Sequence, residues 1–234
     1  MRKLLGTLVV VCGLLSLGVF IPTIASATLV YDNAPPDHSS GTGMTIFIVA
    51  EDFPLGPGTL TGVRFWDVGD PRGYNGSISW GIYSNSLANT PGTLLFSGNT
   101  SIVTRTPTGC NTGVCTSFPE FQNDFALPNV PLSGGQYWLG LHNGPLPQGT
   151  TPENFFWETH TGPDLAGQYC QVESTGKDFA SCSGTDWSVT PQGDHAFQLF
   201  GNVGVVPEPS TLLLLGSALP GLAGILVHRR RRLA

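Results

Sequence analysis

Positive charge is scarce in this chain, and most of it lies at the two ends. Only 10 of the 234 residues are Lys or Arg, and six of these ten fall within the first three or the last six residues. Between residues 28 and 205, four basic residues stand against fifteen acidic ones, which gives a formal net charge of −11. Because phosphate binding requires clustered Lys and Arg, this segment is not expected to bind nucleic acid or anionic lipid headgroups.

Recognisable catalytic motifs are also missing. The chain has no Gly-x-Ser-x-Gly nucleophile elbow, no phosphate-binding glycine loop and no His-Glu-x-x-His helix. The spacing of the histidines between residues 28 and 205 indicates no metal or acid–base site; they are His38, His142, His160 and His195. Acidic pairs are present, but any acidic domain supplies them, so a sandwich-fold hydrolase is the less favoured prediction. We expect a protein that is not an enzyme and that uses no cofactor, with calcium as the one exception considered below.

Sustained apolar spacing at 3.6 residues is absent, so few helices are expected. Period-two alternation is frequent instead, as where Ile78, Trp80 and Ile82 alternate with smaller residues, and this pattern is typical of half-buried strands. Strands are predicted at residues 45–49, 60–66, 78–82, 94–97, 118–125, 137–141, 155–158 and 195–200. Eight or nine short strands separated by Gly and Pro turns favour an all-β fold, a single antiparallel β-sandwich of jelly-roll type.

The first 27 residues have the features of a secretory signal peptide. Two basic residues precede a largely apolar stretch at residues 4–21, and small residues follow at 25–27. We predict that signal peptidase cleaves after Ala27, so that the mature chain begins at Thr28.

The C-terminal residues 206–234 combine a Pro-Glu-Pro motif, an apolar run at 212–227 and four arginines at 229–232. As a helix, the run of sixteen residues would cover roughly 24 Å of a hydrocarbon core of about 30 Å, and the arginines would remain on the cytoplasmic side. This order resembles a PEP-CTERM sorting signal. The resemblance implies that an exosortase-type membrane enzyme recognises Pro207, Glu208 and Pro209 and removes the tail.

This resemblance also implies where the protein goes. It implies export, transient residence in the inner membrane through the C-terminal helix, and a final place on the surface or in the extracellular matrix of a Gram-negative bacterium. Association with exopolysaccharide is expected, since proteins with this tail tend to come from bacteria that make such polymers. The chain is therefore divided into a signal peptide (1–27), an exported β-sandwich domain (28–205) and a sorting signal (206–234).

A weaker resemblance involves the middle of the chain. Segments 60–66, 81–84, 91–95 and 135–139, with the closing segment 196–201, resemble the choice-of-anchor type of sandwich domain. Bacterial surface proteins pair such domains with interchangeable C-terminal anchors. The resemblance implies a fold and a surface location. It carries no functional residue to this chain.

Four cysteines remain after removal of the signal peptide, and an even number in an exported chain indicates disulfides. Three connectivities are open, of which we favour the local pairs Cys110 with Cys115 and Cys170 with Cys182. A zinc site is the alternative. It is disfavoured because the spacings lack a Cys-x-x-Cys element and no histidine flanks them closely in the sequence.

Aromatic residues suggest a second function, a carbohydrate-binding module, because an indole or phenol face can stack on a sugar ring. Trp157, Tyr169 and Trp187 lie in or beside the loop-rich stretch 150–194, so we expect these three to be exposed. Asp67 and Asp70 flank a Val-Gly turn and form a weak candidate calcium site, since carboxylate oxygens suit that ion. The first expectation nevertheless remains an exported surface or matrix protein without enzymatic activity.

Overall fold

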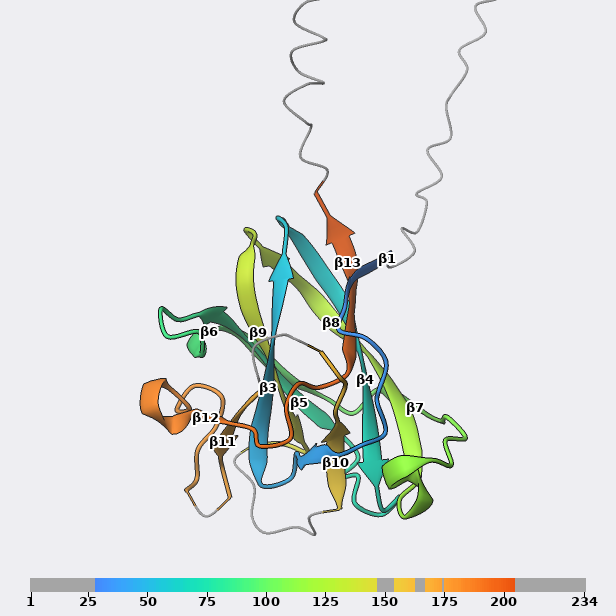
Figure 1. Ribbon diagram of the computed structural model, residues 1–234. Coiled ribbons are helices and arrows are strands. Elements are labelled where there is room, and N and C mark those ends of the chain that lie inside the picture. Colours follow the sequence, from blue (N-terminus) through green and yellow to red (C-terminus); the bar gives the residue numbers. More distant parts are fainter. Residues whose placement is uncertain (1–27, 147–153, 163–166, 174, 205–234) are drawn as a thin grey trace, which may run out of the picture.

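A computed structural model describes residues 28–146, 154–162, 167–173 and 175–204, which form two antiparallel sheets packed face to face (Figure 1). The predicted signal peptide, the sorting motif and the apolar run at 212–227 lie outside these residues. Among the described residues, no helix has the length and apolar character needed to cross a membrane.

The first sheet has seven strands, and β4 is at its centre. On one side β4 pairs with β8, which in turn pairs with β7; on the other side it pairs first with β13 and then, toward its end, with β10. β1 pairs with β13, and β2 with β10. The bounds are β1 (Thr28–Asp32), β2 (Gly41–Gly43), β4 (Gly58–Gly69), β7 (Val103–Pro107), β8 (Glu120–Leu132), β10 (Phe155–Glu158) and β13 (Phe197–Val203).

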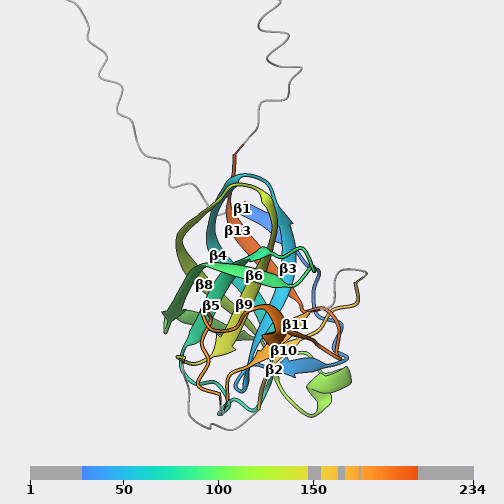
Figure 2. The ribbon, with the colours of Figure 1, turned by 90° about the vertical axis from the view of Figure 1, so that its left-hand side faces the viewer.

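The second sheet has six strands in the order β12-β11-β3-β9-β5-β6. Its central strands β3, β9 and β5 run side by side in both views (Figure 1 and Figure 2). The bounds are β3 (Phe47–Leu55), β5 (Ile78–Asn85), β6 (Pro91–Thr100), β9 (Gly135–Asn143), β11 (Gln168–Gln171) and β12 (Ser188–Val189). Two single-turn 3₁₀ helices lie in loops, η1 (Gly113–Thr116) and η2 (Gly184–Asp186).

The strand pairing is that of a jelly roll. β1 pairs with β13, β3 with β9, β4 with β8, and β5 with β6, so the chain folds like one long hairpin wrapped around a core. The resulting orders, β1-β13-β4-β8 facing β3-β9-β5-β6, form a double-sheet jelly roll. The predicted all-β sandwich of jelly-roll type is confirmed, and all eight predicted strands are present. Thirteen strands occur in the described residues, rather than eight or nine.

Two hydrophobic clusters hold the sandwich together. The larger one fills the space between the sheets and includes Phe53 of β3, Phe65 of β4 and Leu139 of β9, all fully buried. The smaller one lies on the outer face of the six-stranded sheet, where Trp138 of β9 is covered by the segment from β11 to β12. β9 is therefore buried on both faces, which stabilises the centre of this sheet.

Two glycines make room for this outer covering. Gly81 lies directly opposite Gly140 in the pairing of β5 with β9. A Cβ atom built on Gly81 would stand 2.6 Å from the ring of Phe179, and one on Gly140 would stand 3.2 Å from it. The ring therefore occupies the surface that two side chains would otherwise fill.

Both ends of the described domain lie at the same end of the sandwich. Thr28 pairs opposite Gly201, so the first residue of the predicted mature chain lies close to the end of β13 at Val203 (Figure 1). The opposite end is formed by β2, β10 and the loop that contains η1 (Figure 1 and Figure 2). We call it the far end below.

Candidate functional site

Both predicted disulfides are present. Cys110 is bonded to Cys115 and Cys170 to Cys182. The first closes a small loop around η1, at the far end. The second ties the chain that follows β11 to that strand, and both of its cysteines belong to the outer hydrophobic cluster.

The expected exposure of the candidate glycan-binding tryptophans is wrong. Trp157 is fully buried between the sheets, and its Nε1 donates to the carbonyl of Ala196 at 2.8 Å. Trp187 is 7% exposed and packs edge-on against Tyr83, because the segment after β11 folds back over the six-stranded sheet. Tyr169 is half-buried against Phe47, with ring centroids 4.7 Å apart. The structure does not bring these three side chains together on a surface.

The two candidate calcium ligands form ion pairs with two different arginines. Asp67 is fully buried, and its carboxylate accepts from both Arg105 Nη2 at 2.6 Å and Arg105 Nε at 3.2 Å. Asp70 accepts from the exposed Arg72 at 3.0 Å. Burial raises the pKa of Asp67, and Arg105 opposes that shift. The geometry thus gives Asp67 and Asp70 ion-pairing partners rather than a shared cation.

A polar cluster at the far end was not found from the sequence. His38 precedes β2, Glu120 is the first residue of β8, and Glu158 is the last residue of β10. His38 Nδ1 lies 2.8 Å from Glu120 Oε2 and 3.0 Å from Glu158 Oε1. Both glutamates are buried, whereas the side chain of His38 is 34% exposed. Burial raises the pKa of Glu158 well above its usual range, and the neighbouring Glu120 carboxyl adds to the effect.

The disulfide loop positions this histidine. Val114 of η1 donates its N–H to the carbonyl of His38 at 2.9 Å. His38 has a positive φ of 59°, an uncommon conformation for a residue with a side chain. Gly113 is required for the close approach, since a Cβ there would stand 1.9 Å from the His38 carbonyl oxygen. Cys115 Sγ then lies 3.8 Å from His38 Nδ1, so a histidine distant in sequence does flank this cysteine pair.

A buried histidine, His195, lies between the sheets. Glu51 Oε2 accepts from the backbone N–H of His195 at 2.9 Å and lies 2.8 Å from His195 Nδ1. The other ring nitrogen of His195 contacts the hydroxyl of Thr42 at 2.8 Å. Burial, together with Asp194 and Asp52, raises the pKa of Glu51 well above its usual range. Burial lowers the pKa of His195, and His160 adds to this shift. Both shifts favour the uncharged form of each side chain.

This pair predicts a pH dependence of stability. In the unfolded chain Glu51 loses its proton near pH 4.5 and His195 near pH 6.5. Because the pKa of Glu51 is raised in the folded protein, the folded chain binds this proton more tightly than the unfolded chain does. The stability that results is fully present below about pH 4.5 and is lost as pH rises toward the folded pKa. As pH rises above 5, we expect the wild type to lose up to about 1.4 kcal/mol more per pH unit than Glu51→Gln, measured by urea unfolding across this range. Equal losses in the two proteins would contradict this prediction.

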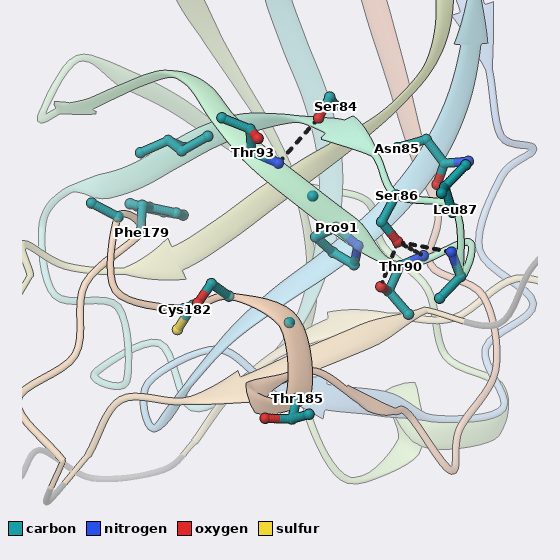
Figure 3. A pocket seen from close by; sticks show the side chains of 16 residues that line it. Ser84, Asn85, Ser86, Leu87, Thr90, Pro91, Thr93, Phe179, Cys182 and Thr185 are labelled. Carbon is teal, nitrogen blue, oxygen red and sulfur yellow. Dashed lines mark hydrogen bonds between the residues drawn. The ribbon is translucent and has the colours of Figure 1, made fainter.

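A wide groove on the six-stranded sheet contains no charged residue among the described residues that line it. It has a volume of about 1140 Å³ and lies between the β5–β6 hairpin and loop 179–185, which includes the start of η2 (Figure 3). Leu87, Pro91 and Phe179 supply apolar surface, and the other side chains are mainly hydroxyls and amides. Ser86 Oγ holds the hairpin in shape through contacts with Thr90 (Figure 3).

These features define the class of protein: an all-β, jelly-roll sandwich with two disulfides, followed by a separate C-terminal segment. Comparison with protein families identifies that segment, since residues 205–232 match the PEP-CTERM protein-sorting motif. The chain is therefore an exported protein that an exosortase-type membrane enzyme processes during membrane-associated sorting. No curated protein and no solved structure matches the chain.

Proposed function

We propose that this chain is a non-enzymatic protein of the cell surface or extracellular matrix that associates with neutral exopolysaccharide. The observation that carries the proposal is the uncharged groove between the β5–β6 hairpin and loop 179–185. It stands out on a domain whose formal net charge between residues 28 and 205 is −11. A neutral sugar presents hydroxyl groups at its edge and C–H groups on its faces, and this groove offers matching hydroxyls, amides and apolar side chains.

This mode of binding differs from the stacking mode expected from the sequence. All five tryptophans are between 0% and 8% exposed, so none provides a flat platform for a sugar ring. Hydrogen bonds from Ser, Thr and Asn side chains, with packing on Leu87 and Pro91, replace that platform. We therefore place carbohydrate recognition at the groove and not at Trp157, Tyr169 or Trp187.

The groove favours binding over hydrolysis. No carboxylate or histidine is found among the described residues that line it, and glycoside cleavage uses two carboxyl groups roughly 5–10 Å apart across the bound sugar. The buried Glu120 and Glu158 do not supply such a pair, because their oxygens converge on a single nitrogen of His38.

The position of the groove suits a protein sorted by its tail. Both ends of the described domain lie at one end of the sandwich, near Thr28 and Val203. The groove lies instead on the flank formed by β5, β6 and η2 (Figure 1). It would remain accessible while the tail is in the membrane.

Exposed apolar side chains provide a matched test. Leu87 is fully exposed and lines the groove, whereas Ile102, at the turn between β6 and β7, is 84% exposed and lies outside it. We expect Leu87→Ser to weaken binding of the exported protein to neutral polysaccharide by about fivefold to tenfold, or ~1 kcal/mol. Thr185→Glu should weaken it further, because it places a carboxylate in the groove.

Binding should be measured by calorimetry and affinity electrophoresis against neutral polymers that include the producer's own exopolysaccharide. Ile102→Ser should bind like wild type. The proposal fails if no polymer binds, or if Leu87→Ser and Ile102→Ser bind equally well.

A further inference from the structure

We propose that His38, Glu120 and Glu158 form a binding site for one divalent transition-metal ion of the zinc type. The proposal does not depend on the glycan groove, which is formed by other elements. It assigns a function to the polar cluster at the far end, where three separate parts of the chain meet.

The separations between the ligand atoms carry the proposal. His38 Nδ1 lies 2.8 Å from Glu120 Oε2 and 3.0 Å from Glu158 Oε1. A tetrahedral zinc ion with bonds of about 2.1 Å holds neighbouring ligand atoms about 3.4 Å apart, and a site with right angles holds them about 3 Å apart. The two observed separations are therefore within about 0.6 Å of those in a metal site. One imidazole nitrogen and two carboxylate oxygens are also an ordinary ligand set for zinc. The three side chains are thus already gathered at coordination distances.

Hydrogen bonding within the protein satisfies this cluster only in part. A ring nitrogen carries at most one hydrogen, so His38 Nδ1 cannot donate fully to both carboxylates. Glu158 is fully buried, and its Oε2 has no hydrogen-bond partner among the described residues. Among these residues, His38 is also the only group within ion-pairing distance of either glutamate. The carboxyl groups of Glu120 and Glu158 also hydrogen-bond to each other, which requires a proton on one of them. Glu158 Oε2 still has no partner, and a cation bound in place of the shared proton would compensate both carboxylates.

The surroundings favour a cation further. Asp37 and Asp67 both lie close enough to act electrostatically on Glu158. Asp67 already accepts two hydrogen bonds from Arg105. This arginine therefore neutralises Asp67 and not Glu158. His38, with 34% of its side chain exposed, gives an ion access from solvent.

The Cys110–Cys115 disulfide lies beside the proposed site and supplies no ligand to it. Cys115 Sγ lies 3.6 Å from Glu120 Oε2, and η1 holds the backbone of His38 in place. Potential ligand atoms of His38, Cys110, Cys115 and Glu120 all lie within 4.8 Å of one another. Only a reduced pair could offer thiolates, which bind metal strongly. In an exported protein with both disulfides formed, the ligands are the nitrogen and the carboxylate oxygens.

Such an ion would link three segments that are distant in sequence. His38 belongs to the loop before β2, while Glu120 and Glu158 lie on strands that flank the end of β4 on its two sides. Calcium is not the expected ion, because it prefers six to eight oxygen ligands at 2.3–2.6 Å.

The test is calorimetric titration of Zn²⁺ into the exported protein, with both disulfides formed, after removal of metal with a chelator and in the presence of excess Ca²⁺. We expect one equivalent to bind and to raise Tm. His38→Ala and Glu158→Gln should each weaken binding by at least about 100-fold, because even the loss of an outer-shell partner weakens metal binding 10–100-fold. Glu51→Gln is the matched control, since Glu51 is equally buried and also contacts a histidine; its affinity should equal that of wild type.

Three outcomes would overturn the proposal. They are no Zn²⁺ binding by the oxidised protein, binding that both ligand variants retain, and binding that requires reduction of Cys110–Cys115, which would indicate a thiolate site. If Glu158→Gln does not fold, His38→Ala still decides, because His38 is partly exposed and lies in a loop. None of these outcomes bears on polysaccharide binding, so the two proposals fail independently.

Discussion

Replacing Arg105 by methionine is expected to lower the free energy of unfolding by about 3–5 kcal/mol. Arg105 makes a two-pronged ion pair with Asp67, whose side chain is fully buried, and only 13% of the Arg105 side chain is exposed. Its guanidinium also lies 3.6 Å from the ring centroid of Phe121. The substitution leaves a buried carboxylate whose remaining donor is Asn123, and that uncompensated charge accounts for most of the loss.

The same sheet contains a matched control. Arg64 pairs with Asp124 at 2.7 Å, but both side chains are 31% exposed. We expect Arg64→Met to cost less than about 1 kcal/mol, because solvent screens an exposed pair. Urea unfolding of both variants measures the difference. Adding Asp67→Asn to Arg105→Met should recover part of the lost stability; equal losses at Arg64 and Arg105, or no recovery, would show that burial of the charge is not the cause.

The strands that could be predicted from the sequence are those that bury one face. Ile78, Trp80 and Ile82 alternate with smaller residues, and these three large side chains are the ones that point between the sheets. The strands that were missed are short or largely exposed, such as β7 and β12. Their pairing relies on backbone hydrogen bonds, which leave little trace in the pattern of apolar residues.

The covering of the outer face of the six-stranded sheet could not be predicted. Trp187 lies in a Ser- and Gly-rich stretch that reads as a loop, yet this stretch folds back onto Tyr83 and Trp138. The signal that could have indicated it is the pair Gly81 and Gly140, which leave space for Phe179. Their significance depends on knowing that β5 and β9 are neighbours, and periodicity alone does not reveal this.

The candidate sites show the same division between local and distant contacts. The disulfides were predictable because their partners lie 5 and 12 residues apart. His38 and Glu120 are separated by more than eighty positions, and Glu158 lies still further along the chain. No local spacing connects them, since it is the pairing of β4 with both β8 and β10 that brings the two glutamates together.

Trp157 provides the second large expected effect, because its predicted role in glycan binding and its observed role in the core lead to opposite results. The indole is fully buried and lies edge-on to Phe65 and Phe197. We expect Trp157→Ala to destabilise the protein by about 3–5 kcal/mol through the cavity it leaves. For a domain of this size the loss corresponds to a fall in Tm of about 10 °C, measured by thermal unfolding.

The variant Trp157→Phe separates the two roles. It keeps an aromatic ring in the core but removes the hydrogen bond from Nε1 to the Ala196 carbonyl, so a smaller loss of about 2 kcal/mol is expected. Because the indole does not reach the surface, polysaccharide binding by the folded Trp157→Phe protein should equal that of wild type, while Leu87→Ser should bind more weakly at unchanged stability. If Trp157→Phe loses polysaccharide binding without a change in Tm, then Trp157 contacts the polysaccharide directly. The groove would in that case not be the binding site.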